Sequence, residues 1–183
     1  MKTRNRLAAL FTLIWVSLAL TACGAGPTPT PTQISRPDWF DMELTDAQTG
    51  KVFKINDFSG KVVLVETMAM WCPNCLVQAA EVRRLHELLD NRDDLISVSL
   101  DVDINEDQAS LKKYTEEYDL NWRFAVTPLE VARAIGNLYT AQYLNAPLSP
   151  MMIIDRNGNV HHLEYGRKTA EILAKNLEPY LTP

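Results

Sequence analysis

Residues 61–75 read KVVLVETMAMWCPNC, an apolar run that ends in two cysteines separated by two residues. The stretch from Val62 to Met68 has the length and composition of a strand that is buried on both faces. From Pro73 to about Leu89 the apolar residues repeat with helical spacing and supply one inward face. A buried strand that leads through a Cys-x-x-Cys directly into a helix indicates the α/β class.

Strands and helices alternate on either side of this unit. Such alternation predicts one α/β domain, residues 38–183, in which helices flank both faces of a mixed central sheet and a β-hairpin forms an N-terminal extension. The expected strands are 40–44 and 51–55 (the hairpin), 62–68, 95–100, 122–126, 151–154 and 160–163, and the expected helices are 73–89, 107–118, 129–139 and 169–181.

The motif places two thiols at the start of a helix. Pro73 suits the first helical position because its φ is fixed and it has no N–H to satisfy. Cys72 then lies at the positive end of the helix dipole, where free backbone N–H groups stabilise a thiolate. The spacing of three residues brings Cys75 onto the same helical face, so the pair can close a disulfide. Because thiolates are the nucleophiles of thiol chemistry, we expect Cys72 to be the exposed, attacking sulfur and Cys75 the resolving one.

These residues resemble the active-site segment of the thioredoxin superfamily. The closest branch is the TlpA/ResA-like extracytoplasmic thiol–disulfide oxidoreductases, which are usually tethered to a membrane. The resemblance covers about residues 38–181 and rests on the Trp71-Cys72-x-x-Cys75 motif at a strand–helix junction. It implies a thioredoxin fold, a redox-active Cys72–Cys75 pair that reduces protein disulfides, and a membrane thiol carrier as electron donor. No dissociable cofactor and no metal are required. Cytochrome c maturation is the commonest setting of the family, although no residue here demands it.

Glu66 lies six residues before Cys72, where thioredoxins have a buried acid and many TlpA-like proteins have a neutral residue. An acid inside a buried strand is costly unless it is paired or functional. A raised pKa would suit Glu66 to move a proton to or from Cys75 during exchange. The alternative is a carboxylate at the end of a strand that reaches water or a basic partner.

The superfamily also has a cis-proline just before the strand that packs beside the disulfide. Pro150 is the best match to that position, and Pro147 is the competing candidate. The resemblance implies that Pro150 and the backbone of Ser149 dock the substrate chain, while Trp71 and Pro73 shape the surface beside the attacking sulfur.

The third cysteine, Cys23, follows a leader that has the features of a secretory signal. Residues 1–22 have a basic start, an apolar run from Leu7 to Leu20 and small residues before the cysteine. The run is shorter than the ~20 residues of a membrane span. Leu20-Thr21-Ala22-Cys23 resembles a bacterial lipobox, which implies a lipid on Cys23 and anchoring at the outer face of the cell membrane or in the periplasm. The alternatives are a plain signal peptide or an uncleaved anchor.

Residues 23–37 are rich in proline and threonine and predict an extended tether between the anchor and the domain. The chain has 18 basic and 23 acidic residues; residues 1–22 hold three of the basic and none of the acidic, so the remainder has a net charge of −8. This acidic balance argues against nucleic acid as a partner.

Two other kinds of site fit the residues poorly. A zinc site needs four ligands, but the chain has a single Cys-x-x-Cys, and the adjacent His161 and His162 would point to opposite faces of a strand. Resemblance to a peroxiredoxin-like peroxidase would require Thr or Ser three residues before the nucleophile, where this chain has Ala69.

A Cu(I) metallochaperone of thioredoxin fold is an alternative from another functional class. Soft thiolate and thioether ligands select Cu(I), and methionines lie near the cysteines or the expected cis-proline. Sco-type copper proteins, however, separate their two cysteines by three residues, whereas two residues intervene here. The methionines in question are Met68, Met70, Met151 and Met152.

Overall fold

A computed structural model describes residues 36–181. The strands are β1 (Leu44–Thr45), β2 (Val52–Phe53), β3 (Val62–Met68), β4 (Leu95–Asp101), β5 (Arg123–Val126), β6 (Met151–Ile154) and β7 (Val160–His162). The α-helices are α1 (Pro73–Leu88), α2 (Gln108–Glu117), α3 (Leu129–Tyr139) and α4 (Ala170–Leu181), and the 3-10 helices are η1 (Asp38–Asp41), η2 (Ile55–Phe58), η3 (Ala141–Leu144) and η4 (Ala146–Leu148).

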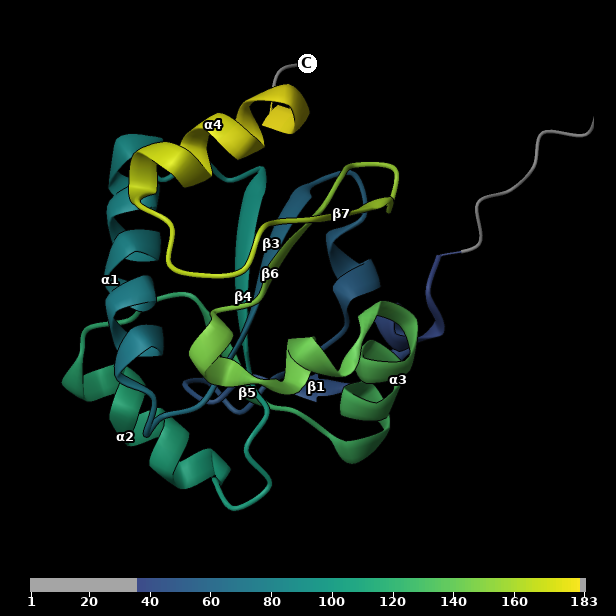
Figure 1. Cartoon of the computed structure of the whole chain (residues 1–183), viewed down its shortest axis with the longest axis vertical. Coiled ribbons are helices and arrows are strands. Elements are labelled where there is room, and N and C mark those ends of the chain that lie inside the picture. The colour runs from purple at the N-terminus through teal and green to yellow at the C-terminus, as the bar shows by residue number, and fades with distance from the viewer. Residues whose placement is uncertain (1–35, 182–183) are drawn as a thin grey trace, which may run out of the picture. The chain divides into compact units, whose positions relative to one another are not determined.

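The predicted mixed sheet is confirmed. Five strands lie in the order β5-β4-β3-β6-β7. The first three run parallel, and β6 and β7 are antiparallel to their neighbours. α1, α2 and α4 pack on one face, and α3 packs on the other (Figure 1). The site therefore lies at the end of a central strand, between two covered faces.

β3 is the buried central strand that the apolar run predicts. All seven of its residues are buried. Val62 and Leu64 pack on the α1 face, whereas Val63 and Val65 pack on the α3 face. Since side chains alternate along a strand, Glu66 shares the face of Leu64 and points toward α1.

The N-terminal hairpin is confirmed in a shorter form. β1 and β2 pair antiparallel. The carboxylate of Asp46 accepts hydrogen bonds from the N–H groups of Gln48 and Thr49 in the turn. Gly50 then completes the turn at a φ of +69°, which glycine adopts without strain.

The strand predicted over residues 40–44 is wrong in its first part. Residues 38–41 form η1, and only Leu44 and Thr45 pair with β2. Trp39 and Phe40 are both fully buried in the same cluster. Consecutive residues of a strand face opposite sides, whereas a helical turn allows both rings to pack on the α3 face.

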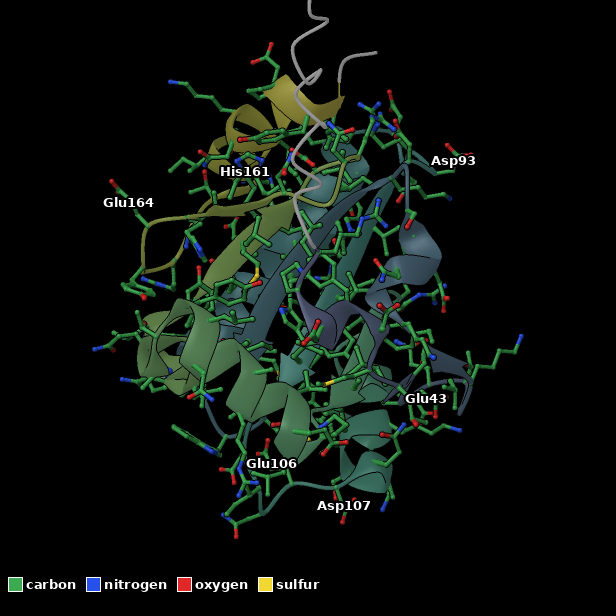
Figure 2. All side chains as sticks on the ribbon, turned by 90° about the vertical axis from the view of Figure 1, so that its right-hand side faces the viewer. Glu43, Asp93, Glu106, Asp107, His161 and Glu164 are labelled. Atoms are coloured by element: carbon green, nitrogen blue, oxygen red, sulfur yellow. The ribbon has the colours of Figure 1, made fainter. Side chains whose placement is uncertain are left out.

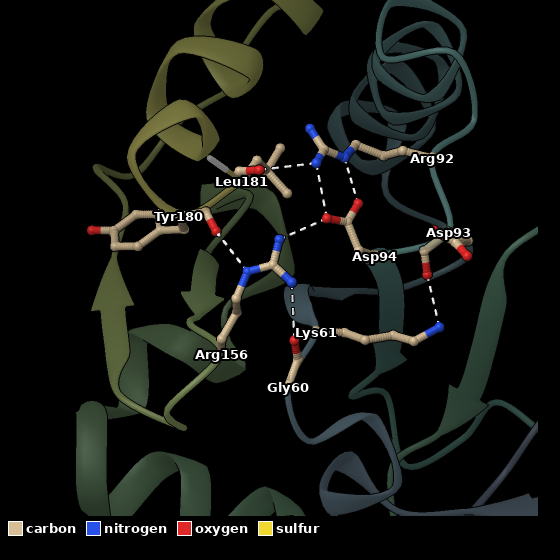
Figure 3. Close-up of polar contacts among 8 residues, drawn as sticks. All are labelled: Gly60, Lys61, Arg92, Asp93, Asp94, Arg156, Tyr180 and Leu181. Atoms are coloured by element: carbon tan, nitrogen blue, oxygen red, sulfur yellow. Dashed lines mark hydrogen bonds and ion pairs between the residues drawn. The ribbon is translucent and has the colours of Figure 1, made fainter. Parts of the chain in front are cut away.

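Asp94 connects three segments at the end of the sheet far from the cysteines (Figure 3). Its carboxylate accepts hydrogen bonds from Arg92 at 2.8 Å and from Arg156 at 2.6 Å. The same guanidinium groups donate to the carbonyl oxygens of Leu181 and Tyr180. These bonds hold the pKa of Asp94 well below its usual range. The start of β4 is thereby tied to the β6–β7 turn and to the end of α4.

Removing this carboxylate leaves two guanidinium groups without their shared acceptor. We expect Asp94→Ala to lower the free energy of unfolding by about 2 kcal/mol at neutral pH, since hydrogen bonds to charged groups contribute roughly 1.5–3 kcal/mol. Because the folded pKa lies below the unfolded one, this stabilisation is present above about pH 4 and is lost as the pH falls further. Urea unfolding measures both effects. Asp93→Asn is the control, since Asp93 contributes its backbone oxygen to Lys61; equal losses in the two variants would contradict the assignment.

Candidate active site

The two cysteines lie at the start of α1, as the motif predicts. Cys72 is the N-cap residue, and its Sγ accepts a hydrogen bond from the N–H of Cys75 at 3.3 Å. Pro73 occupies the first helical turn and is exposed. The Sγ of Cys75 donates to the carbonyl oxygen of Ala146 at 3.4 Å. Both cysteines are free thiols, so the structure represents the reduced dithiol.

Cys72 is buried, which corrects the expectation of an exposed attacking sulfur. The exposed fraction is 1% for Cys72 and 3% for Cys75. η4 lies against the start of α1, where Ala146 accepts the Cys75 bond and the carbonyl of Pro147 accepts one from Asn74 at 3.2 Å. Nothing in the local sequence predicts this contact between segments more than seventy residues apart. Contact of the Cys72 sulfur with another molecule therefore requires a local movement that uncovers it.

The surroundings of Cys75 disfavour its thiolate. Burial raises the pKa of the Cys75 thiol well above its usual range, and the neighbouring Cys72 and Glu66 raise it further. Cys75 therefore reacts as a thiolate only after a base has taken its proton.

Glu66 is buried, with 5% of its surface exposed, so it does not reach water; the other part of the alternative, a basic partner, fits the nearby charge of Lys168. Burial raises the pKa of Glu66 to about 7, opposed by a hydrogen bond from Ser99 and by the charge of Lys168. The ammonium of Lys168 itself donates to the carbonyl oxygens of Ser149 and Gly166. A carboxyl with a pKa near neutrality is populated in both forms at physiological pH, so it can accept or release a proton.

No peptide bond in the described part of the chain is cis, so the prediction of a cis-proline at Pro150 or Pro147 is wrong for this structure. Ser149 reverses the chain instead, with a left-handed φ of 45° and ψ of 58°. Its N–H donates to Ala146, its carbonyl accepts from Lys168, and its exposed fraction is 3%. Pro150 is also buried. A docking role for these two residues stays a prediction, and it would need this segment to open.

The exposed surface beside the motif is built around Trp71. Its side chain is 58% exposed, and its indole N–H donates to the carboxylate of Asp103 at 2.6 Å. A hollow of about 240 Å³ opens next to it. The hollow is open to solvent and lies directly beside the motif. Its apolar lining comprises Ala69, Trp71, Val102, Ile104, Leu144, Ala146 and Pro147.

The sequence did not indicate three groups of the site. One is Lys168, described above, and the other two are Tyr114 and Glu106. Tyr114 on α2 is 7% exposed, and its hydroxyl has no hydrogen-bond partner among the described residues. Burial, followed by the nearby carboxyl and thiol groups, raises its pKa. Glu106 binds the backbone N–H groups of Met70 and Trp71. The acidic run around Glu106 is visible in the sequence, but only the tertiary structure places it against the motif.

Within residues 36–181, no group of three or more His, Cys, Asp or Glu residues is arranged to hold a metal ion. In the same part of the chain, no helix has the length and apolar character that crossing a membrane requires. The predicted signal peptide, Cys23 and nearly all of the predicted tether lie outside the described residues.

Known proteins resemble this chain in sequence and in fold. A family model described as Redoxin matches residues 29–180. The thiol-disulfide oxidoreductase ResA of Geobacillus kaustophilus is 28% identical over 142 residues, which cover 75% of this chain and 73% of that protein.

Two solved structures illustrate the likeness in fold. A thioredoxin family thiol:disulfide interchange protein from Chlorobium tepidum has a TM-score of 0.62 at 18% identity, covering 77% of this chain and 93% of its own. A SCO1/SenC family lipoprotein from Bacillus anthracis has a TM-score of 0.61 at 22% identity, with the same coverage of 77% and 93%. These likenesses confirm the expected thioredoxin fold.

Proposed function

The chain belongs to the Redoxin family, and on that premise we propose that it reduces protein disulfides through Cys72 and Cys75. It is a thiol–disulfide oxidoreductase, as are its ResA relatives. The observation that supports the activity is the pair of free thiols at the start of α1, where the Sγ of Cys72 accepts a hydrogen bond from the N–H of Cys75. The reductive direction is inferred from the resemblance to the TlpA/ResA-like branch, most of whose members act as reductants.

In the proposed reaction the Cys72 thiolate attacks one sulfur of a substrate disulfide. A mixed disulfide forms between Cys72 and the substrate, and the other substrate sulfur leaves as a thiolate and takes up a proton. The Glu66 carboxylate then accepts the proton of Cys75. The resulting Cys75 thiolate attacks the sulfur of Cys72, which releases the second substrate thiol and leaves a Cys72–Cys75 disulfide. Two electrons have passed to the substrate, so the enzyme must be reduced again before the next cycle.

The redox equilibrium of the Cys72–Cys75 pair with glutathione tests the direction. We expect a potential near the reducing end of the known range, about −270 mV, rather than near the oxidising end at about −120 mV. A potential at the oxidising end would contradict the reductase assignment. Cys23→Ala is the matched control, because it keeps the redox pair and removes the expected lipid site.

We further infer that the protein works outside the cytoplasm, anchored through Cys23, and that a membrane thiol carrier reduces it. The lipobox-like sequence supports the anchor, and the similar protein of Bacillus anthracis is described as a lipoprotein. Cytochrome c maturation stays a prediction. The likeness to the SCO1/SenC protein is one of fold alone, so it does not favour Cu(I) binding over thiol–disulfide exchange.

Mass spectrometry of the protein from bacterial membranes tests the anchor. We expect a mature N-terminus at Cys23, because the lipobox-like sequence implies a lipid on this cysteine. We expect several acyl chains on it, because a single chain gives only marginal membrane binding. The Cys23→Ala variant should lose the lipid. An intact leader, or an unmodified N-terminus at another residue, would refute the assignment.

A further inference from the structure

Glu106 holds the two residues that precede Cys72. Its Oε2 accepts a hydrogen bond from the N–H of Met70 at 2.8 Å, and its Oε1 accepts one from the N–H of Trp71 at 3.3 Å. Both residues lie between the end of β3 and the start of α1, so neither N–H belongs to the pattern of the strand or of the helix. A buried backbone N–H group without an acceptor destabilises a fold, and of the two the N–H of Met70 is the partly buried one. The carboxylate therefore stabilises the short connection on which the position of Cys72 depends.

The loop between β4 and α2 binds the end of β3 and the connection at one further point each. The N–H of Val102 donates to the carbonyl of Met68 at 2.9 Å, and Asp103 accepts the indole N–H of Trp71. The loop is itself held by Asp101, which is fully buried and accepts a hydrogen bond from the N–H of Asp103 at 3.1 Å. The loop that contacts the motif is thus itself held to the end of β4.

Asp101 also explains how two acids can lie together here. Burial, and then the neighbouring Glu106 carboxyl, raise the pKa of Asp101 above its usual range. The Oδ2 atom of Asp101 has no hydrogen-bond partner in the described part of the chain. A raised pKa at Asp101 lessens the repulsion between the two side chains, and both oxygens of Glu106 accept from the two N–H groups.

From this arrangement we propose that Glu106 is a positioning residue for thiol–disulfide exchange. It fixes the backbone of Met70 and Trp71, and through them it sets Cys72 at the head of α1 and the Trp71 ring at the rim of the hollow. The proposal rests on the proposed function, because it assigns a role in that same reaction. Without the carboxylate the connection loses two of its hydrogen bonds and can shift, and a misplacement of about 1 Å at a reacting group can lower a rate on the order of a hundredfold.

The test compares three variants of the full chain: Glu106→Ala, Glu106→Gln and Asp107→Asn. Figure 2 shows that Glu106 and Asp107 lie at the same end of the molecule. Asp107 caps α2 by accepting from the N–H of Ser110, and asparagine caps a helix as well as aspartate. Asp107→Asn therefore removes the same charge one residue away without disturbing the connection.

Insulin reduction and the alkylation of Cys72 by iodoacetamide over a range of pH are the two readouts, with urea unfolding alongside. We expect Glu106→Ala to lower kcat/KM about tenfold or more and to change the alkylation profile. Glu106→Gln should recover part of the rate, because its amide oxygen can accept one of the two hydrogen bonds. Asp107→Asn should match the wild type in both readouts.

Wild-type rates in Glu106→Ala would overturn the proposal, and so would equal losses in Glu106→Ala and Asp107→Asn, which would indicate an effect of charge alone. Should Glu106→Ala fail to fold, Glu106→Gln decides, because wild-type rates in it would also overturn the proposal. Cys72→Ser in the same assay distinguishes a failure of the proposed function from a failure of the positioning role of Glu106. If it stays active, the proposed function fails; if it is inactive while the Glu106 variants are unaffected, only the positioning role fails.

Discussion

The Cys72→Ser variant is expected to lose thiol–disulfide exchange by several orders of magnitude. A hydroxyl does not ionise at neutral pH and does not replace a thiolate as a nucleophile toward disulfides. Cys75→Ser is expected to behave differently, since it keeps the attacking sulfur and lacks the resolving one. It should react once with a substrate disulfide and then accumulate the mixed disulfide.

Mass spectrometry after acid quenching distinguishes these outcomes. The expected result is a substrate adduct on Cys72 in the Cys75→Ser variant and none in the Cys72→Ser variant. The Cys23→Ser variant, in which the redox pair is intact, should turn over like the wild type. An adduct on Cys75 in the Cys72→Ser variant, formed at the wild-type rate, would reverse the assignment of the attacking sulfur.

Glu66→Gln is expected to stabilise the protein in alkaline solution and to slow the resolving step. Burial raises the pKa of Glu66 from its ordinary value of 4.5 to about 7. Each pKa unit corresponds to about 1.4 kcal/mol between the two protonation states, so ionisation of Glu66 in the folded protein costs about 3 kcal/mol. Since the folded pKa is the higher one, the stability is fully present below the unfolded pKa and is lost as the pH rises through the folded pKa. The glutamine cannot ionise and should not show this loss.

Urea unfolding at several pH values measures the effect of this variant on stability. The two proteins should differ little below about pH 4.5 and diverge by about 3 kcal/mol above about pH 7. The mixed disulfide should persist longer in Glu66→Gln, because the buried Cys75 thiol then lacks its base. Glu43→Gln is the matched control, since the side chain of Glu43 is 70% exposed at the surface (Figure 2). Parallel stability curves for wild type and Glu66→Gln would refute the role of burial.

The secondary structure was predictable where each element carries its own local signal. The apolar run of β3, the proline at the first turn of α1 and the Asp-x-x-Gly turn between β6 and β7 all act over a few residues, and each is confirmed. Prediction failed at η1, because Trp39 and Phe40 are buried together by packing on the α3 face. No local pattern shows on which side of a chain its packing partner will lie.

The sequence by itself determined the strand–motif–helix unit, the placement of Cys72 and Cys75 at the start of one helix, and the burial of an acid at Glu66. These features follow from spacing along one strand and one helix, whose periods are set by the backbone. Only the tertiary structure decided that η4 covers the dithiol, that Ser149 turns the chain with trans peptide bonds, and that Glu106 binds Met70 and Trp71 from 36 and 35 residues away. Such contacts depend on which strands pair and on how loops meet at the end of the sheet. For that reason the sequence identified the two cysteines, while the groups that cover them and hold the preceding residues became visible only in the fold.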